Sequence, residues 1–242
     1  MTNEEDVKTY LSMQNARYDE RAAIAEVFKD RILNECVVGT YELQEKFPYD
    51  ENILKTFSKN PNESIILEYG CGPGRNLKRL APKFKKAVGI DIGKGNLENA
   101  RKLLSLNNIS NCEYVHTTGD NIPLPDSSID LIFSVICMQH ICSHTVRSRI
   151  LDDMARVLTP GGVLVIQMGF NKDWMPDNYV DYYTDRLLGV KDTNGFCDCC
   201  VQNENQLIED FSKRGLKNIT AWLTGNVNDP NHPQWIWCSG QK

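Results

Sequence analysis

The chain has 242 residues, enough for one α/β domain with a sizeable buried core. Its 27 Lys and Arg against 32 Asp and Glu give a formal net charge of −5, which argues against a partner held through nucleic-acid phosphates. No stretch approaches the ~20 apolar residues of a membrane span, and the start Met1-Thr-Asn-Glu-Glu-Asp6 is unlike a secretory signal. We therefore expect a cytoplasmic protein that binds neither nucleic acid nor membrane.

The first 50 residues precede the core and are predicted to be helical. Ile24, Phe28 and Ile32 recur every four residues, which predicts a helix from about Tyr18 to Asn34 with one apolar face. The simplest expectation is a helix that packs on the edge of the domain.

A glycine-rich turn between a strand and a helix is the most informative stretch. Ile65–Leu67 is a short apolar run typical of a buried parallel strand, and Gly70, Gly72 and Gly74 follow at alternate positions. Glycines in such a turn bring backbone N–H groups close to a ligand. The next apolar strand, Ala87–Asp91, ends in a carboxylate about 20 residues later, where βαβ nucleotide sites bind ribose hydroxyls.

The glycine spacing distinguishes between cofactors. A dinucleotide fingerprint needs glycine at position 75, where this chain has Arg75, so a nicotinamide-dependent oxidoreductase is disfavoured. The segment Glu68–Gly74 reads E-x-G-x-G-x-G and resembles motif I of the class I methyltransferases that depend on S-adenosylmethionine (SAM), of the type 11-like, small-molecule kind. The resemblance implies SAM as cofactor, with Asp91 as the ribose-binding acid. It implies further contacts from Glu68, Gly70, Cys71, Gly72, Asn76 and Ile92.

The third strand, Cys112–His116, is followed by a polar turn, Thr118–Pro125. This turn resembles the family segment in which an acid binds the adenine amino group and the next backbone N–H binds a ring nitrogen. Adenine needs an acceptor and a donor side by side, so the resemblance assigns Asp120 and Asn121 to the adenine.

The segment Ile136–Ile141 follows the fourth strand, Ser128–Val135, and should border the reaction centre. The resemblance puts Val135 and Gln139 beside the cofactor. The segment has neither the Asx-Pro-Pro-aromatic tetrapeptide of relatives that methylate nucleic-acid bases and amides nor the acid of metal-assisted relatives. His140 is our candidate general base because imidazole titrates near neutral pH; alternatively it only packs beside SAM.

The rest of the chain completes the predicted fold. Ala155–Gly162 resembles a family turn, Val163–Gln167 is the fifth strand, Glu204–Arg214 is a helix closed by Gly215, and Ile219–Leu223 and Gln234–Cys238 form a hairpin. We predict a Rossmann-like, doubly wound α/β domain: seven strands, mostly parallel, with a C-terminal antiparallel hairpin and N-terminal helices. The single domain, 1–242, divides into a helical cap (1–50), a SAM-binding core (64–170), an insert (171–203) and a terminal helix and hairpin (204–242).

Two segments are candidates for a lid over the acceptor. The insert is long and rich in aromatic residues: Trp174, Tyr179, Tyr182, Tyr183 and Phe196. In relatives, insertions here build the acceptor pocket, and an N-terminal helix reaches the methionine end of SAM, a role that the resemblance gives to Tyr18 and Arg21. The alternative for the insert is a purely structural helical segment.

No metal site is expected. The nine cysteines include the cluster Cys197-Asp-Cys199-Cys200, but only Cys197 and Cys200 have the spacing of zinc ligands, and no second pair is evident.

We therefore expect a metal-independent enzyme, monomeric or homodimeric, that transfers a methyl group from SAM to an oxygen or nitrogen of a small-molecule acceptor. In-line displacement at the methyl carbon requires alignment more than covalent chemistry by the protein. Two alternatives stay open: a non-catalytic SAM-fold subunit that binds a protein partner, and a methyltransferase that acts on a protein.

Overall fold

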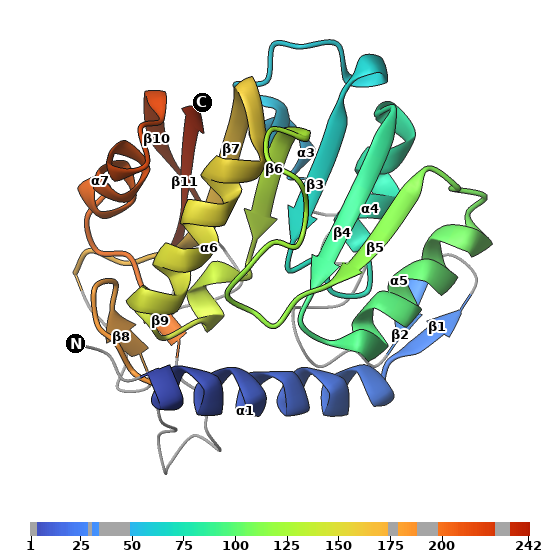
Figure 1. Ribbon diagram of the computed structural model, residues 1–242, viewed down its shortest axis with the longest axis horizontal. Helices are drawn as coiled ribbons and strands as arrows, with labels where there is room; N and C mark the ends of the chain where they lie inside the picture. The colour runs from blue at the N-terminus through green and yellow to red at the C-terminus, as the bar shows by residue number, and fades with distance from the viewer. Residues whose placement is uncertain (1–3, 29–30, 34–48, 174–178, 188–197, 226–232) are drawn as a thin grey trace.

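The computed structural model describes residues 4–28, 31–33, 49–173, 179–187, 198–225 and 233–242. A seven-stranded sheet with the order β10-β11-β7-β6-β3-β4-β5 forms its centre (Figure 1). The parallel strands are β3 (Ile65–Tyr69), β4 (Lys86–Asp91), β5 (Cys112–His116), β6 (Ile129–Val135) and β7 (Leu158–Phe170). The last strand, β11 (Gln234–Gln241), runs antiparallel to β7 and to β10 (Lys217–Gly225), which confirms the predicted fold class.

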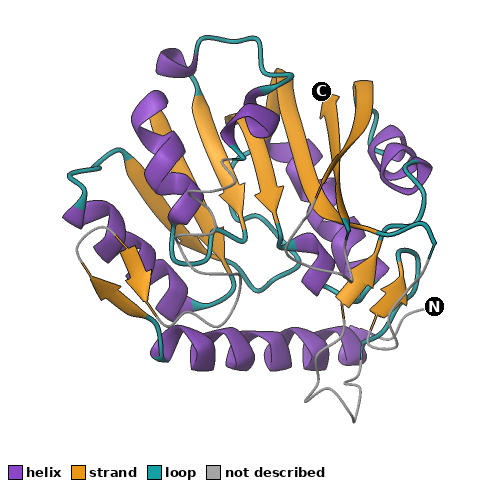
Figure 2. Cartoon of the chain, turned by 180° about the vertical axis from the view of Figure 1, so that it is seen from behind, coloured by secondary structure: helices purple, strands orange, loops and turns teal. Residues whose placement is uncertain are grey.

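Both faces of the sheet are buried under helices (Figure 2). In β3, Ile66 packs in the layer that contains α3 (Asp50–Leu54), α4 (Arg75–Leu80) and α5 (Lys94–Leu106). Its neighbour Leu67 packs in the opposite layer, with α6 (His144–Val157) and α7 (Asn205–Lys213). Burial on both faces explains why the strands appear in the sequence as continuous apolar runs rather than alternating ones.

The strand order creates a binding edge. The chain runs from β3 outward to β4 and β5 and then returns to the other side of β3 as β6. The connection after β3 leads to β4 on one side, and the connection after β6 leads to β7 on the other side. Because these two connections diverge, a crevice opens at the carboxyl ends of β3 and β6. The long helix α1 (Glu4–Ala23) crosses this edge (Figure 1). Asn99 of α5 donates to the carbonyl of Ala22 at 3.1 Å, which holds one end of α1 in place.

The predicted boundaries of the N-terminal helix are wrong. The helix ends at Ala23, and β1 (Glu26–Phe28) pairs antiparallel with β2 (Arg31–Leu33). Ile24, which was expected on the buried face, is 54% exposed. A spacing of four residues fits about one turn of a helix, but it is also a multiple of the two-residue repeat of a strand. The apolar pattern therefore could not distinguish a helix from a strand.

Short elements complete the described chain. They are three 3₁₀ turns, η1 (Pro61–Glu63), η2 (Ala81–Lys83) and η3 (Met138–His140), and two parallel strands of the insert, β8 (Tyr179–Asp181) and β9 (Asp198–Cys200). Both described ends of the insert therefore contain strand rather than the helix considered as an alternative. Gly215 has φ +72° after α7, which confirms its predicted role in closing that helix. Within the described ranges, no helix has the length and apolarity needed to cross a membrane.

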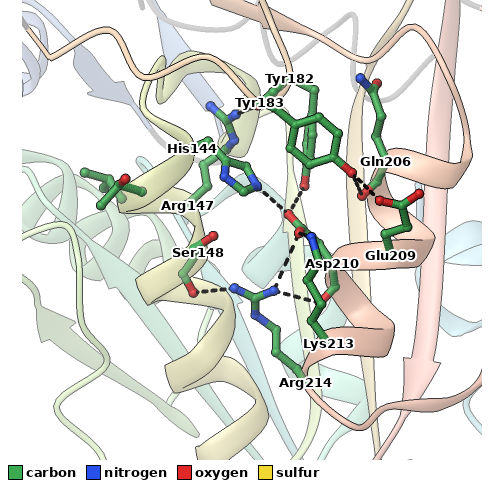
Figure 3. Close-up of polar contacts among 12 residues, drawn as sticks. His144, Arg147, Ser148, Tyr182, Tyr183, Gln206, Glu209, Asp210, Lys213 and Arg214 are labelled. Atoms are coloured by element: carbon green, nitrogen blue, oxygen red, sulfur yellow. Dashed lines mark hydrogen bonds and ion pairs between the residues drawn. The ribbon is translucent and has the colours of Figure 1, made fainter. Parts of the chain in front are cut away.

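A buried polar cluster attaches the insert to α6 and α7 (Figure 3). The carboxylate of Asp210 pairs with His144 Nε2 at 2.9 Å and accepts a hydrogen bond from the Tyr182 hydroxyl at 2.9 Å. Arg147, fully buried, donates to the carbonyl of Tyr182 and lies over its ring. Tyr182 is 1% exposed, so this part of the insert is packed as firmly as the core.

Candidate active site

A cavity opens at the carboxyl edge of the sheet, between the glycine loop, the ends of β3, β4 and β6, and α1. It encloses about 1100 Å³ when the space open to solvent is included. Most of the predicted site residues line it: Tyr18, Arg21, Glu68, Gly70, Cys71, Gly72, Asn76, Asp91, Ile92, Val135 and His140. Residues from the cap, the glycine loop and the end of β6 thus meet at one site.

The glycine loop leaves β3 with a left-handed backbone. Gly70 and Gly72 have φ of +73° and +50°. A Cβ on Gly70 would lie 2.1 Å from Cys137 Sγ, so packing requires glycine there. A Cβ on Gly72 would meet no atom within 4 Å, because that position faces open space. Gly70 therefore allows close packing, whereas Gly72 keeps backbone accessible to a ligand.

Asp91 lies at the end of β4 and is only 6% exposed. Its Oδ1 accepts from the Gly93 N–H at 2.8 Å and from Asn96 Nδ2 at 3.1 Å, and its Oδ2 accepts from the Gly72 N–H at 2.8 Å. Burial raises the pKa of the carboxyl group, and the backbone hydrogen bonds oppose this. A carboxylate offers about four acceptor positions, so a further donor, such as a ribose hydroxyl, still has a place on Oδ2.

Glu68 is a second buried acid on the cavity wall, 1% exposed. Asn76 Nδ2 donates to its Oε1 at 2.6 Å, while Oε2 has no hydrogen-bond partner among the described residues. Burial raises the pKa of Glu68 to about 8. Because an unsatisfied buried oxygen costs free energy, this atom is suited to meet a donor or a cation on a bound ligand.

Helix α1 contributes more to the cavity than the sequence indicated. Besides Tyr18 and Arg21 it provides Tyr10, Leu11 and Gln14. The Tyr10 hydroxyl accepts a hydrogen bond from the Cys142 N–H at 3.1 Å, which ties α1 to the segment after η3. The sequence reasoning missed Tyr10 and Leu11 because it started the helix near Tyr18.

Other residues of the cavity wall were also missed: Arg75, Asn96, Thr117, Gly119 and Cys137. Arg75 had been considered only as the residue that breaks the dinucleotide pattern. Its position directly after three glycines, at the start of α4, was the available signal that it borders the ligand.

Asp120, Asn121 and Gln139 do not line the cavity. Asp120 Oδ2 pairs with Arg149 Nη1 at 3.2 Å, and Arg149 also pairs with Glu4 of α1. Asn121 accepts hydrogen bonds from Thr117 and Thr118. The Gln139 side chain accepts from the Gly169 N–H at 2.8 Å and is 3% exposed, so it ties η3 to β7. Cofactor contacts by these three residues stay predictions.

His140 lies on the cavity wall at the end of η3. Its Nδ1 is 2.8 Å from Asp198 Oδ1 in β9, and the two side chains are 11% and 8% exposed. Asp198 was not predicted, because its only sequence context was the cysteine cluster. The aromatic residues Tyr179, Tyr182 and Tyr183 line no part of the cavity, and Trp174 lies outside the described residues.

Within the described ranges, no group of three or more His, Cys, Asp or Glu side chains is arranged to hold a metal ion. Cys199 and Cys200 are fully buried, and Cys197 lies outside the described residues.

Comparisons with known proteins agree with this geometry. A family described as a methyltransferase domain matches residues 66–162. The chain is 26% identical over 204 residues to the ubiquinone/menaquinone biosynthesis C-methyltransferase UbiE of Psychromonas ingrahamii, covering 78% of this chain and 76% of that protein. It is 27% identical over 176 residues to a probable tRNA methyltransferase 9B of Homo sapiens, covering 73% of this chain and only 34% of the human protein.

A solved structure shows the same fold. Phosphoethanolamine N-methyltransferase 2 of Haemonchus contortus, in complex with S-adenosyl-L-methionine, superimposes with a TM-score of 0.62 at 17% identity. The match covers 81% of this chain and 52% of that one. The sheet order, the glycine loop with Asp91 and these matches place the chain among the class I S-adenosylmethionine-dependent methyltransferases.

Proposed function

We propose that the protein transfers the methyl group of SAM to an oxygen or nitrogen of a small-molecule acceptor, without a metal and with His140 as general base. The observation that carries the proposal is a shared cavity. Gly72, Asp91 and Glu68, which suit the cofactor, line the same space as His140, which can accept a proton. Cofactor and base therefore meet within one enclosure.

The cavity wall offers complementary groups for each part of the cofactor. SAM supplies an electrophilic methyl group on a sulfonium. Asp91 would accept from the ribose, and the carboxyl group of Glu68 would face positive charge. Arg21 and Arg75 both line the cavity and would meet the methionine carboxylate. Since each of these groups is fixed by the fold, the cofactor would be held in one orientation, as in-line displacement requires.

The chain's own chemical task is to take up a proton. SAM would supply the methyl group and would keep the electron pair of its carbon–sulfur bond on sulfur. His140 Nε2 would accept the proton of the acceptor. Charge is dispersed in this reaction, so exclusion of water by α1 favours it.

A small acceptor is supported by how the cavity is covered. Tyr10, Leu11 and Tyr18 of α1 form part of its wall, and an acceptor would be enclosed beneath that helix. The relatives do not identify the acceptor, because their names include a tRNA methyltransferase, a quinone-pathway C-methyltransferase and a phosphoethanolamine N-methyltransferase. A cytoplasmic location, predicted from the sequence, is part of the proposal. A monomer or homodimer stays our expectation.

We also propose that the cap (1–50) and the insert (171–203) jointly close the acceptor site, although not through the described aromatic side chains of the insert. The support is that α1 forms one wall of the cavity, while Asp198 of the insert contacts His140 beside it. Closure by both segments would exclude water from the sulfonium.

The test is a transfer assay with methyl-labelled SAM and separate small-molecule, protein and tRNA fractions. We expect label in a small molecule, attached to oxygen or nitrogen, and less label with Asp91→Ala at a SAM concentration below the Kd of that variant. Label only in protein or tRNA would contradict the acceptor class, and label on carbon would contradict the acceptor atom. If no fraction is labelled although calorimetry shows SAM binding, the non-catalytic subunit is favoured instead.

A further inference from the structure

We infer that Asp198 is a positioning residue: it holds the His140 imidazole with its proton on Nδ1, so that Nε2 is the basic nitrogen for the acceptor. The inference rests on the proposed function for its catalytic consequence, but the tautomer itself is independent of any reaction. Asp198 belongs to the insert, 58 residues from His140 along the chain, and does not line the cavity. It therefore acts through His140 and not on the substrate.

The position of Asp198 is fixed by backbone pairing. β9 pairs in parallel with β8, with Asp198 opposite Tyr179. Directly after β9, the Val201 N–H donates to the Gly169 carbonyl at 3.2 Å, and the Asn171 N–H donates to the Val201 carbonyl at 3.0 Å. The carboxylate is thus held against η3 by an attachment to the end of β7, the central strand next to β6.

The chemistry of the two groups sets the tautomer. An ionised carboxylate only accepts hydrogen bonds, and a neutral imidazole has one N–H, so the contact of 2.8 Å requires that proton on Nδ1. Nε2 then keeps its lone pair. When Nε2 takes up the acceptor proton, the imidazolium lies next to the negative charge of Asp198. This charge stabilises the imidazolium. If His140 took no part in proton transfer, the same pair would only attach the insert to η3, which is called here a clamp role. The test must distinguish this clamp role from the positioning role.

Other groups of α1 and of the segment before η3 face this pair. Burial lowers the pKa of Arg17, and Asp198 is among the charges that oppose the lowering, so the two interact. Tyr18 is close enough for Asp198 and Cys137 to add to the rise that burial causes in the pKa of its phenol. The positive charge of Arg17 weakens the effect of Asp198, whereas neutral Tyr18 and Cys137 leave it unchanged at neutral pH.

The protein contains a matched control. His144 and Asp210 form a second His–Asp pair, at 2.9 Å, which also attaches the insert to the core but does not line the cavity. Asp198→Asn and Asp210→Asn each remove one carboxylate charge from a His–Asp pair, and Asp210 also pairs with Lys213 and Arg214. A clamp role predicts similar effects of the two variants on turnover, whereas a positioning role predicts that only Asp198→Asn alters His140.

The experiment is ¹⁵N NMR of the histidine side chains in the full chain with S-adenosylhomocysteine bound, with His140→Gln to assign the signals. We expect the Nδ1–H tautomer in the wild type and its loss in Asp198→Asn. Asp210→Asn should leave the His140 tautomer unchanged, and Asp198→Glu, which keeps the charge, should retain the Nδ1–H tautomer.

The kinetic readout is the pH profile of kcat with the acceptor found by the transfer assay. For Asp198→Asn the rate at neutral pH should fall at least about tenfold, with SAM affinity within a few-fold of normal.

An Nε2–H tautomer in the wild type, or an unchanged His140 tautomer in Asp198→Asn, overturns the inference whatever the enzyme does. An equal loss of rate in Asp198→Asn and Asp210→Asn also overturns it. If the tautomer is as expected but His140→Gln keeps the full rate, the general base of the proposed function is wrong and the arrangement of the pair stands.

Discussion

Replacing Gly72 by alanine should weaken SAM binding while costing the fold little. Gly72 has φ +50°, and a left-handed backbone costs a residue with a side chain about 1–2 kcal/mol. The new Cβ would meet no protein atom within 4 Å, so this strain is the whole cost. For a chain of this size, it corresponds to a fall of about 2–8 °C in Tm.

The effect on binding has a different origin. The open space next to Gly72 belongs to the cavity, and a methyl group there would occupy volume that the cofactor needs. Forcing a methyl group into a filled site costs about 1–3 kcal/mol, which corresponds to a ~5–150-fold increase in Kd. Isothermal titration of SAM measures this increase, and thermal unfolding measures the strain.

Gly215 provides the control for backbone strain. It has φ +72°, a Cβ there would also meet nothing within 4 Å, and it lies after α7, outside the cavity wall. Gly215→Ala should lower Tm by a similar amount and leave the Kd for SAM unchanged. If Gly72→Ala binds SAM within about twofold of the wild type, the cofactor does not approach this loop and our placement of SAM is refuted.

Four further predictions follow from the same geometry. Asp91→Ala should weaken SAM binding about 10–150-fold, from the ~1.5–3 kcal/mol of a charged hydrogen bond; unchanged affinity by calorimetry in a folded variant would contradict its role. Burial raises the pKa of Glu68 to about 8, so the folded chain keeps a proton on Glu68 that the unfolded chain loses. The stability difference between the wild type and Glu68→Gln, measured by urea unfolding, should therefore shift against the wild type from about pH 4.5 to 8, and a constant difference would contradict this. Burial raises the pKa of Asp210, but hydrogen bonds from His144 and Tyr182 outweigh burial, so the pKa of Asp210 is lowered in the folded chain. The stability that Asp210 contributes is therefore present above about pH 4 and lost at lower pH. The difference in unfolding free energy between the wild type and Asp210→Asn should narrow on acidification, and a constant difference would disprove this. Activity should survive EDTA, and elemental analysis should find no stoichiometric zinc; one zinc per chain, lost on changing Cys197 or Cys200, would show that the cluster binds metal.

The core of the fold and the glycine loop were predictable from the sequence because their signals are local. The strand Ile65–Tyr69, the turn through Gly70 and Gly72, and the acid Asp91 all lie within one βαβ unit. Hydrophobic runs report burial on both faces of a sheet, and glycines report a left-handed turn, without reference to distant residues. The C-terminal hairpin and the closing Gly215 were predicted for the same reason.

The N-terminal region was misread because a local pattern had two solutions. The apolar residues at 24, 28 and 32 fit a helix, and the chain forms the β1–β2 hairpin there instead. Val27, 8% exposed, packs in the layer with α5, so contacts with a distant helix decide in favour of the strand. Local propensity is a weak guide where tertiary packing can override it.

The polar partners of the site depended on tertiary structure alone. Asp198 reaches His140 across 58 residues, and Arg149 reaches Asp120 across 29, through side chains whose neighbours in the sequence give no sign of the pairing. A hydrogen bond needs its atoms within about 3 Å, and only the folded arrangement of η3, β9 and α6 brings these groups that close. The sequence determined the layered sheet and the glycine loop through local patterns. The tertiary structure decided that Asp198 pairs with His140 and that Arg149 pairs with Asp120, the predicted adenine-binding acid. The sequence could not show either pairing, because a single long-range contact leaves no periodic signal in the chain.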